Sequence, residues 1–185
     1  MPNVLIPLAK GYEELEAVTI IDLLRRAEIT VITASLEQQT VVVASRGVRM
    51  VADTTLDKVI YDDFDMIILP GGLPGATHLN DDIRIHAILK RLHQSSKAVA
   101  AICAAPIVLA NAGLLNGKRA TCYPGILNTN DWPEITLSDD AVVIDDNILT
   151  SRGPGTAMDF ALAIIEFLTN HTTRNEVEIG LVRSA

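Results

Sequence analysis

The stretch Lys97-Ala98-Val99-Ala100-Ala101-Ile102-Cys103-Ala104-Ala105-Pro106 decides the fold, because a short apolar run there delivers a cysteine into a cluster of small residues. The run Ala98–Ile102 follows polar residues, which predicts a strand buried on both faces. The residues after Cys103 favour a helix with Pro106 in its first turn, where the missing N–H of a proline has no partner to lose. Cys103 is therefore predicted to lie on a turn from strand to helix.

A cysteine on such a turn resembles the nucleophile elbow of hydrolases, in which the side chain projects at the carboxyl end of a central strand. Unpaired N–H groups at the start of the helix, that of Ala104 among them, would point toward the sulfur and could hold an oxyanion. We expect this position to lower the pKa of Cys103 and to favour the thiolate, which is the reactive form. The alternative is that Cys103 is only a small buried side chain, as most free cysteines are.

The rest of the chain alternates between strand and helix patterns. Strands are predicted at 4–8, 30–34, 66–69, 119–122, 141–144 and 148–150, and a small hairpin at 40–44 and 48–52. Helices are predicted over 13–26 and 81–95, after Cys103, from Gly153 onward and over 173–183. This alternation predicts one α/β domain spanning residues 1–185, with a mostly parallel central sheet and its site at the carboxyl ends of the strands.

Composition limits the classes of partner and compartment. A net charge of −8 argues against a surface that binds nucleic acid or anionic membranes. The N-terminus lacks the pattern of a secretory signal, and no apolar run is long enough to span a membrane. Two cysteines form no disulfide framework and suit a reducing compartment. We therefore expect a cytoplasmic protein with no membrane partner and no stable nucleic-acid binding.

Two further strand ends carry residues that could join Cys103. Gly71 and Gly72 follow the strand at 66–69, and their unobstructed N–H groups could donate to an oxyanion, although a tight turn with positive φ is the simpler interpretation. Glu16 lies in the helix after the first strand. Its neighbours Glu13 and Glu14 are interpreted as ordinary acidic residues at a helix N-terminus.

Five segments in order are similar to those of the ThiJ/PfpI superfamily, in the branch that contains the Parkinsonism-associated deglycase and the bacterial YajL-like proteins. They are Leu8-Ala9-Lys10-Gly11-Tyr12-Glu13-Glu14-Leu15-Glu16, Ser45-Arg46, Leu69-Pro70-Gly71-Gly72, Ala100-Ala101-Ile102-Cys103-Ala104-Ala105-Pro106 and Leu149-Thr150-Ser151-Arg152-Gly153-Pro154-Gly155-Thr156. Each segment is weakly specific alone, but the five together run nearly from end to end of the chain.

The resemblance implies a flavodoxin-like three-layer sandwich, a homodimer and a cytoplasmic location. It also implies that Cys103 is the nucleophile, that Glu16 is its protonated carboxyl partner and that Gly72 supplies an oxyanion amide. Arg46 and Arg152 are implied as supporting residues near the site and the dimer boundary, and Gly71 and Tyr123 are two further supporting residues of the predicted site. One position departs from the pattern, because Tyr123 stands where hydrolytic members have a histidine beside the cysteine.

The main hypothesis is a deglycase or glyoxalase that needs neither a metal nor another cofactor. Cys103 would attack methylglyoxal, glyoxal or an early glycation adduct, and Glu16 would shuttle the proton, which would protect cells in carbonyl and oxidative stress. The first alternative is a redox-sensing chaperone that binds client proteins when Cys103 is oxidised. The second, a cysteine peptidase or amidase, is weakened by Tyr123, because peptide hydrolysis needs a base and an acid for the leaving amine.

Overall fold

The computed structural model describes residues 1–183 and builds them around a central sheet of seven strands in the order β10-β11-β7-β6-β1-β2-β5. The strands are β1 Asn3–Leu8, β2 Thr30–Ser35, β3 Val41–Val43, β4 Arg49–Val51, β5 Thr54–Thr55, β6 Met66–Leu69, β7 Ala98–Ile102, β8 Arg119–Ala120, β9 Thr136–Leu137, β10 Val142–Asp145 and β11 Ile148–Ser151. The helices are α1 Glu14–Arg26, α2 Leu56–Val59, α3 Gly75–Asp81, α4 Ile83–Gln94, α5 Pro106–Asn111, α6 Ala157–Leu168 and α7 His171–Gly180. Residues 184–185 of the predicted domain lie outside the described residues.

The pairing of the central strands confirms an α/β fold with a mostly parallel sheet. Strand β1 pairs in parallel with both β2 and β6, and β7 pairs in parallel with both β6 and β11. The β2–β5 pair is also parallel, and only the edge hairpin β10–β11 is antiparallel. The carboxyl ends of β1, β6 and β7 therefore meet at one edge of the sheet, where such folds place their sites.

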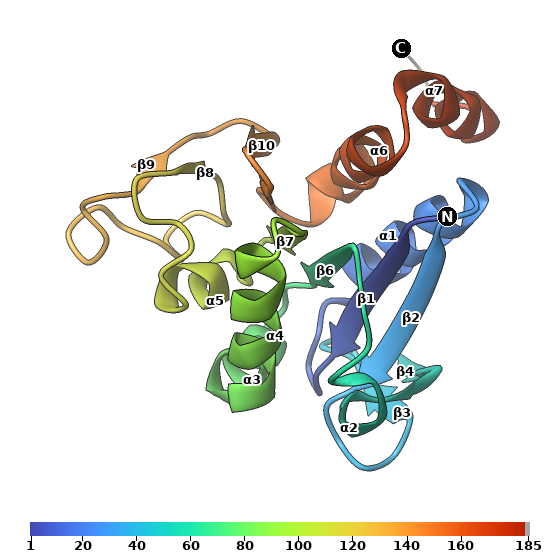
Figure 1. Ribbon diagram of the computed structural model, residues 1–185, viewed down its shortest axis with the longest axis horizontal. Coiled ribbons are helices and arrows are strands. Elements are labelled where there is room, and N and C mark those ends of the chain that lie inside the picture. Colours follow the sequence, from blue (N-terminus) through green and yellow to red (C-terminus); the bar gives the residue numbers. More distant parts are fainter. Residues whose placement is uncertain (184–185) are drawn as a thin grey trace.

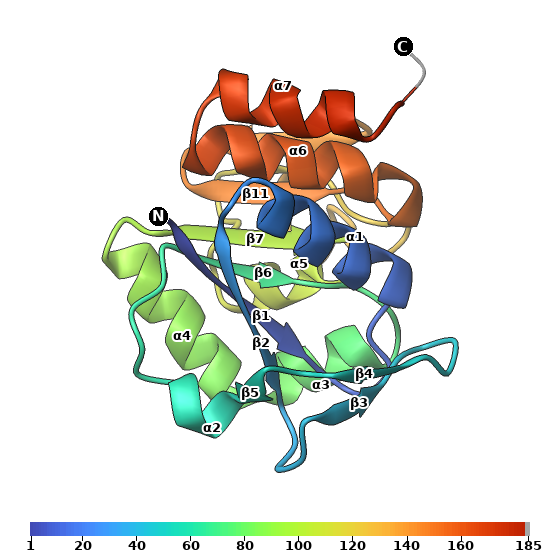
Figure 2. The same cartoon turned by 90° about the vertical axis from the view of Figure 1, so that its right-hand side faces the viewer.

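Helices cover both faces of the sheet and give the three predicted layers. Figure 1 shows α3, α4 and α5 on one side of the central strands and α1 and α6 on the other. Figure 2 shows α6 and α7 stacked beyond β11, with α1 running alongside the sheet. Alternate residues of each central strand enter opposite cores. In β7, for example, Ala100 and Ile102 pack toward α1 and α6, whereas Val99 and Ala101 pack toward the helices of the other face.

The sequence explains the ends of several helices. Helix α1 has acidic residues in its first turn and Arg25 and Arg26 in its last turn, which suits the helix dipole. Pro106 begins α5, as predicted. The helix predicted over 81–95 is shorter than expected, because the side chain of Asp82 accepts a hydrogen bond from the Arg84 amide and caps α4. The preceding α3 was not predicted.

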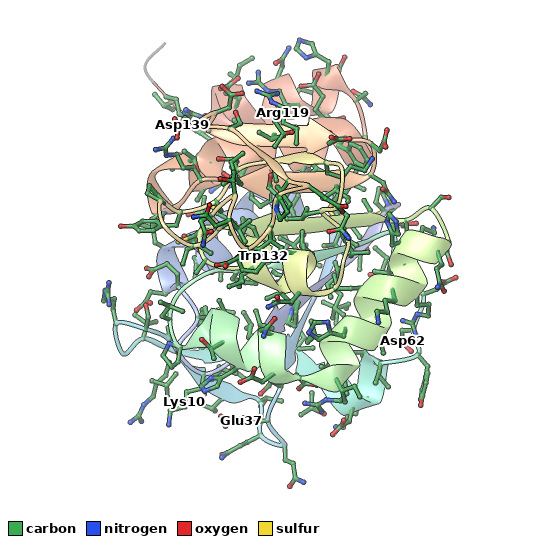
Figure 3. All side chains as sticks on the ribbon, turned by 90° about the vertical axis from the view of Figure 1, so that its left-hand side faces the viewer. Lys10, Glu37, Asp62, Arg119, Trp132 and Asp139 are labelled. Carbon is green, nitrogen blue, oxygen red and sulfur yellow. The ribbon has the colours of Figure 1, made fainter. Side chains whose placement is uncertain are left out.

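Two small sheets lie outside the central one. The predicted hairpin is confirmed as β3 and β4, which pair antiparallel as a separate sheet. Strand β8 ends at Ala120, two residues earlier than predicted, and pairs with β9, which the sequence did not predict. Figure 3 shows Trp132, from the segment between β8 and β9, on the same face of the molecule as α3 and α4, and Trp132 packs there against the buried core. No helix within residues 1–183 is both long and apolar enough to cross a bilayer.

Candidate active site

Cys103 lies directly after β7 in a backbone conformation that few non-glycine residues adopt. Its φ is 63°, in the left-handed region. Two backbone hydrogen bonds hold it there: its N–H donates to Ser151 O at 2.9 Å, and its carbonyl accepts from the Tyr123 N–H at 2.8 Å. Backbone strain of this kind is found at functional sites where the surrounding structure enforces it. The elbow predicted from the sequence is therefore present, and the Cys103 side chain is 8% exposed.

The N–H groups of Gly72 and Ala104 lie against the sulfur of Cys103. Hydrogen bonding from both amides acts to lower the pKa of the thiol. Gly72 has a φ of 86°, and a Cβ at this position would lie 2.4 Å from the Glu13 amide nitrogen. Glycine is required here for both reasons, and it leaves the amide free to face the sulfur.

Glu16 approaches the same sulfur from α1 and is fully buried. Its Oε2 accepts a hydrogen bond of 2.8 Å from the Gly71 N–H, while Oε1 has no hydrogen-bond partner within residues 1–183. A Cβ on Gly71 would lie 2.7 Å from both Cys103 Cβ and Glu16 Oε2. The absence of a side chain at Gly71 thus allows the carboxyl group and the cysteine to meet.

The Glu16 carboxyl and the Cys103 thiol both have raised pKa values. Burial raises the pKa of Glu16 to about 7, against the opposing effect of the thiol and of the Gly71 amide. Burial and the negative charge of Glu16 raise the pKa of Cys103 to about 12, against the effect of the two amides. Our expectation that the helix start lowers the pKa of Cys103 is therefore wrong, because desolvation and a neighbouring carboxylate outweigh two N–H dipoles. Between these two values the pair holds one proton and one negative charge.

A cavity of about 290 Å³ opens beside Cys103. The residues that line it come from six segments of the chain: Glu13, Ser45, Arg46, Gly72, Leu73, Cys103, Ala104, Tyr123, Ile126 and Pro154. The half-exposed Tyr123 ring lies over Gly153, where a Cβ would be 3.3 Å from the ring carbon Cδ2. The cavity is large enough for a compound of a few carbon atoms next to the sulfur.

The structure brings together most of the residues singled out in the sequence. Cys103, Glu16, Gly72 and Ala104 converge, and Arg46 and Tyr123 line the cavity. Arg152 does not line it, because its Nη1 bonds both the carbonyl and Oδ1 of Asp139 at 2.7 Å. Figure 3 shows Asp139 at the outer edge of the molecule. Within residues 1–183 no group of three or more histidine, cysteine, aspartate or glutamate side chains is arranged to hold a metal ion.

Sequence reasoning missed the position of Glu13 in this cavity. The residue immediately precedes α1 and was interpreted as an ordinary acidic group at a helix start, whereas its side chain lines the cavity and accepts a hydrogen bond from Ser45 Oγ at 3.0 Å. The three-residue spacing of Glu13 and Glu16 indicates this position, because residues three apart along a helix lie on the same side and Glu16 belongs to the predicted site.

This chain is similar to known proteins over most of its length. The model of the DJ-1/PfpI family matches residues 2–167. Protein dj-1beta of Drosophila melanogaster is 41% identical over 184 residues, which are 97% of this chain and 96% of the relative. The glutathione-independent glyoxalase DJR-1.2 of Caenorhabditis elegans is 37% identical over 165 residues, 89% of this chain and 87% of the relative. The structure of oxidized DJ-1 from Toxoplasma gondii superimposes with a TM-score of 0.93 at 38% identity and full coverage of both chains.

Some relatives are much longer than this chain. Protein DJ-1 homolog B of Arabidopsis thaliana is 45% identical over 167 residues, which are 89% of this chain but only 37% of the relative. The chain likewise covers 45% of the length of Protein DJ-1 homolog A from the same plant. The likeness to these plant proteins therefore concerns less than half of their length.

The contact at Gly71 generates the first prediction. We expect Gly71→Ala to slow the alkylation of Cys103 by iodoacetamide about tenfold or more and to cost about 1–3 kcal/mol of unfolding free energy, because the added methyl group overlaps Cys103 and Glu16. Peptide mass spectrometry and urea denaturation provide the two measurements. Gly180→Ala is the control, since a Cβ there meets no atom within 4 Å. Equal behaviour of the two variants would contradict the steric role of Gly71.

The raised pKa of Glu16 generates the second prediction. Glu16 is harder to ionise in the folded state than in the unfolded state. Its contribution to stability is therefore fully present when the pH is below its ordinary pKa of 4.5, and it is lost as the pH rises through about 7. The difference corresponds to about 3 kcal/mol. Between pH 5 and pH 8 the unfolding free energy of the wild type should therefore fall by about 2.5 kcal/mol more than that of Glu16→Gln, because part of the loss already occurs below pH 5.

Urea denaturation across this pH range measures the effect. Glu37→Gln, which alters an exposed carboxyl group, serves as the control and should keep the wild-type slope. Parallel pH profiles for the wild type and Glu16→Gln would show that Glu16 does not titrate in this range.

Proposed function

The chain belongs to the DJ-1/PfpI family, and we propose that it is a cofactor-free enzyme that converts reactive dicarbonyls such as methylglyoxal and glyoxal into hydroxy acids. One observation carries the proposal: a buried carboxyl group and two backbone N–H groups surround a cysteine sulfur that opens onto a small cavity. A relative, 37% identical, is named a glutathione-independent glyoxalase. Early glycation adducts belong to the same proposed substrate class.

The proton shared by Glu16 and Cys103 supports nucleophilic attack. When Glu16 holds the proton, its carboxyl group is neutral and no longer raises the pKa of Cys103. The negative charge of the pair then lies on the sulfur. The N–H groups of Gly72 and Ala104 then stabilise the thiolate. The pair can therefore supply a nucleophile and an acid at once, although the pKa of the thiol is high.

The proposed reaction adds water to methylglyoxal and gives lactate. The sulfur forms a bond with the aldehyde carbon, the carbonyl electron pair moves to oxygen, and Glu16 protonates that oxygen. The Glu16 carboxylate then removes the hydrogen of the former aldehyde carbon as a proton and returns it to the neighbouring carbon. The hydroxyl proton of the hemithioacetal passes to the neighbouring oxygen, which leaves a thioester. Water cleaves the C–S bond, releases lactate and restores the cysteine. Gly72 and Ala104 provide the N–H groups nearest to the oxyanion.

An alternative function uses the same residues without turnover. The amides of Gly72 and Ala104 and a protonated Glu16 could equally stabilise an oxidised cysteine, and one similar structure is of an oxidized protein. In that case Cys103 would be a redox sensor, and its oxidation would change the binding of client proteins in the cytoplasm. No observation on this chain favours peptide hydrolysis, because Tyr123 rather than a histidine faces the cavity.

Product analysis tests the enzymatic proposal. We expect purified protein to form lactate from methylglyoxal without any added cofactor, Cys103→Ala to form none above background, and Glu16→Gln to reduce the rate by about 100-fold or more because it removes the acid. Cys122→Ala is the control and should keep the wild-type rate. Lactate formation no faster than with Cys103→Ala would reject the enzymatic proposal and favour the redox alternative.

We also propose that two copies of the chain associate through α1 and the β3–β4 hairpin. Leu15 and Val18 on α1 are 51% and 47% exposed, and Val48 and Val51 of the hairpin are 50% and 69% exposed. The Val48 amide contributes to the environment of Glu14 at the start of α1, so the two elements adjoin. Exposed apolar side chains gathered on adjoining elements are typical of interaction surfaces.

Sedimentation measures this association. We expect a particle of twice the 20.0 kDa chain mass at micromolar concentration and a monomer for Val18→Asp, because a buried charge would destabilise the interface. Ile179→Asp changes an exposed side chain on α7 and should leave the dimer intact. A monomeric wild type would refute the proposed dimer.

A further inference from the structure

The carboxylate of Glu13 is fixed on the wall of the cavity that contains Cys103. Its N–H donates to Gly71 O at 2.9 Å, and its carbonyl accepts from the Ala17 N–H at 3.1 Å. Its side chain accepts from Ser45 Oγ at 3.0 Å and lines the cavity. Backbone hydrogen bonds thus hold Glu13 in place and Ser45 contacts its carboxylate, so its negative charge lies on the wall of the cavity.

The hydrogen bonds around Ser45 leave Glu13 with spare accepting capacity. Ser45 Oγ lies 3.0 Å from Glu13 Oε2 and 2.9 Å from Glu14 Oε2, but a hydroxyl group has only one proton to donate. Glu14 also accepts from the Arg46 amide at 3.0 and 3.2 Å. Glu13 has no such second donor among the side-chain contacts of residues 1–183. Its oxygens are therefore available to a hydrogen-bond donor within the cavity.

Glu13 is also the acidic group with the most direct access to the cavity. Arg46 also lines the cavity and carries the opposite charge, but Arg46 is exposed whereas Glu13 is half-buried, so solvent screens the charge of Arg46 more strongly. Glu16 lies behind the sulfur and does not line the cavity. Burial is the main cause of the raised pKa of Glu16, and the negative charge of Glu13 raises it further. The field of Glu13 therefore reaches the reactive pair.

We propose that Glu13 is a specificity-determining residue, which favours carbonyl compounds with a hydrogen-bond donor or positive charge next to the reactive carbon and disfavours those with a carboxylate there. Hydrated aldehydes, α-hydroxycarbonyl compounds and adducts of arginine or lysine belong to the favoured class, and α-keto acids belong to the disfavoured class. The assignment of substrates rests on the proposed function, whereas selection by charge is a property of the cavity alone.

Two alkylating reagents of similar size but different charge test charge selection without any turnover. Iodoacetamide is neutral and iodoacetate is an anion, and the ratio of their rates at Cys103 cancels changes in the reactivity of the sulfur itself. We expect Glu13→Gln to raise the rate of iodoacetate relative to iodoacetamide by about three- to tenfold. Peptide mass spectrometry separates the alkylation of Cys103 from that of Cys122.

Glu14→Gln is the matched control, because it removes an equal charge from the next residue, which also contacts Ser45 but does not line the cavity. We expect its rate ratio to stay within twofold of the wild type. If Glu13→Gln does not fold, Glu13→Ala removes the same charge and should shift the ratio in the same direction. An unchanged ratio in the Glu13 variant, or an equal shift in Glu14→Gln, would overturn the proposal.

A second measurement connects charge selection with turnover. With methylglyoxal as substrate and glyoxylate as an anionic competitor, Glu13→Gln should bind glyoxylate about three- to tenfold more tightly. A wild type that forms no lactate would reject the proposed function, and the alkylation ratio would still decide the role of Glu13. Turnover with an unchanged glyoxylate affinity in Glu13→Gln would reject the role of Glu13 alone.

Discussion

The site depends on one close contact, in which the backbone of Gly71 fits between the side chains of Cys103 and Glu16. A single methyl group at this position would lie 2.7 Å from each of them. The contact joins the carboxyl ends of β6 and β7 to the first turn of α1, segments that are far apart in the sequence. Because β6 and β7 are parallel neighbours, their ends reach the same edge of the sheet, and the topology rather than local sequence creates the site.

The same contact determines how charge is distributed in the site. A carboxyl group that is fully buried resists ionisation unless donors compensate it, and Glu16 has one compensating N–H group, from Gly71, on Oε2. The other oxygen, Oε1, has no partner within residues 1–183, which suits a protonated carboxyl whose O–H group can donate to an anionic sulfur. The raised pKa of Glu16 and the two amides on the sulfur thus act together, because each favours the arrangement with the proton on the carboxyl group.

The sequence predicts the local features of this site well, because they depend on short segments. The apolar run before Cys103 and the position of Pro106 were sufficient to place the cysteine on an elbow between β7 and α5. The direction of the pKa shift of Cys103 was predicted wrongly, since the helix start is visible in the sequence whereas burial and the proximity of Glu16 arise only when distant segments pack together. The sequence also missed α3, which ends just before Asp82, the residue whose side chain caps α4.

The small sheet formed by β3 and β4 gains a clear role from its contacts with the site. Its first strand and the following turn are fixed to the loop before α1, because Gly11 N–H donates to Val43 O at 2.8 Å and Ser45 N–H donates to Tyr12 O at 2.7 Å. These bonds place Ser45 against Glu13, and Arg46 at the cavity. The central sheet therefore supplies the reactive sulfur and its amides, whereas the excursion supplies the groups that, in our proposal, control which charges approach it. Different substrate preferences could then arise on the same central sheet from changes in this hairpin, because its residues contact the cavity wall and leave the Gly71 contact untouched.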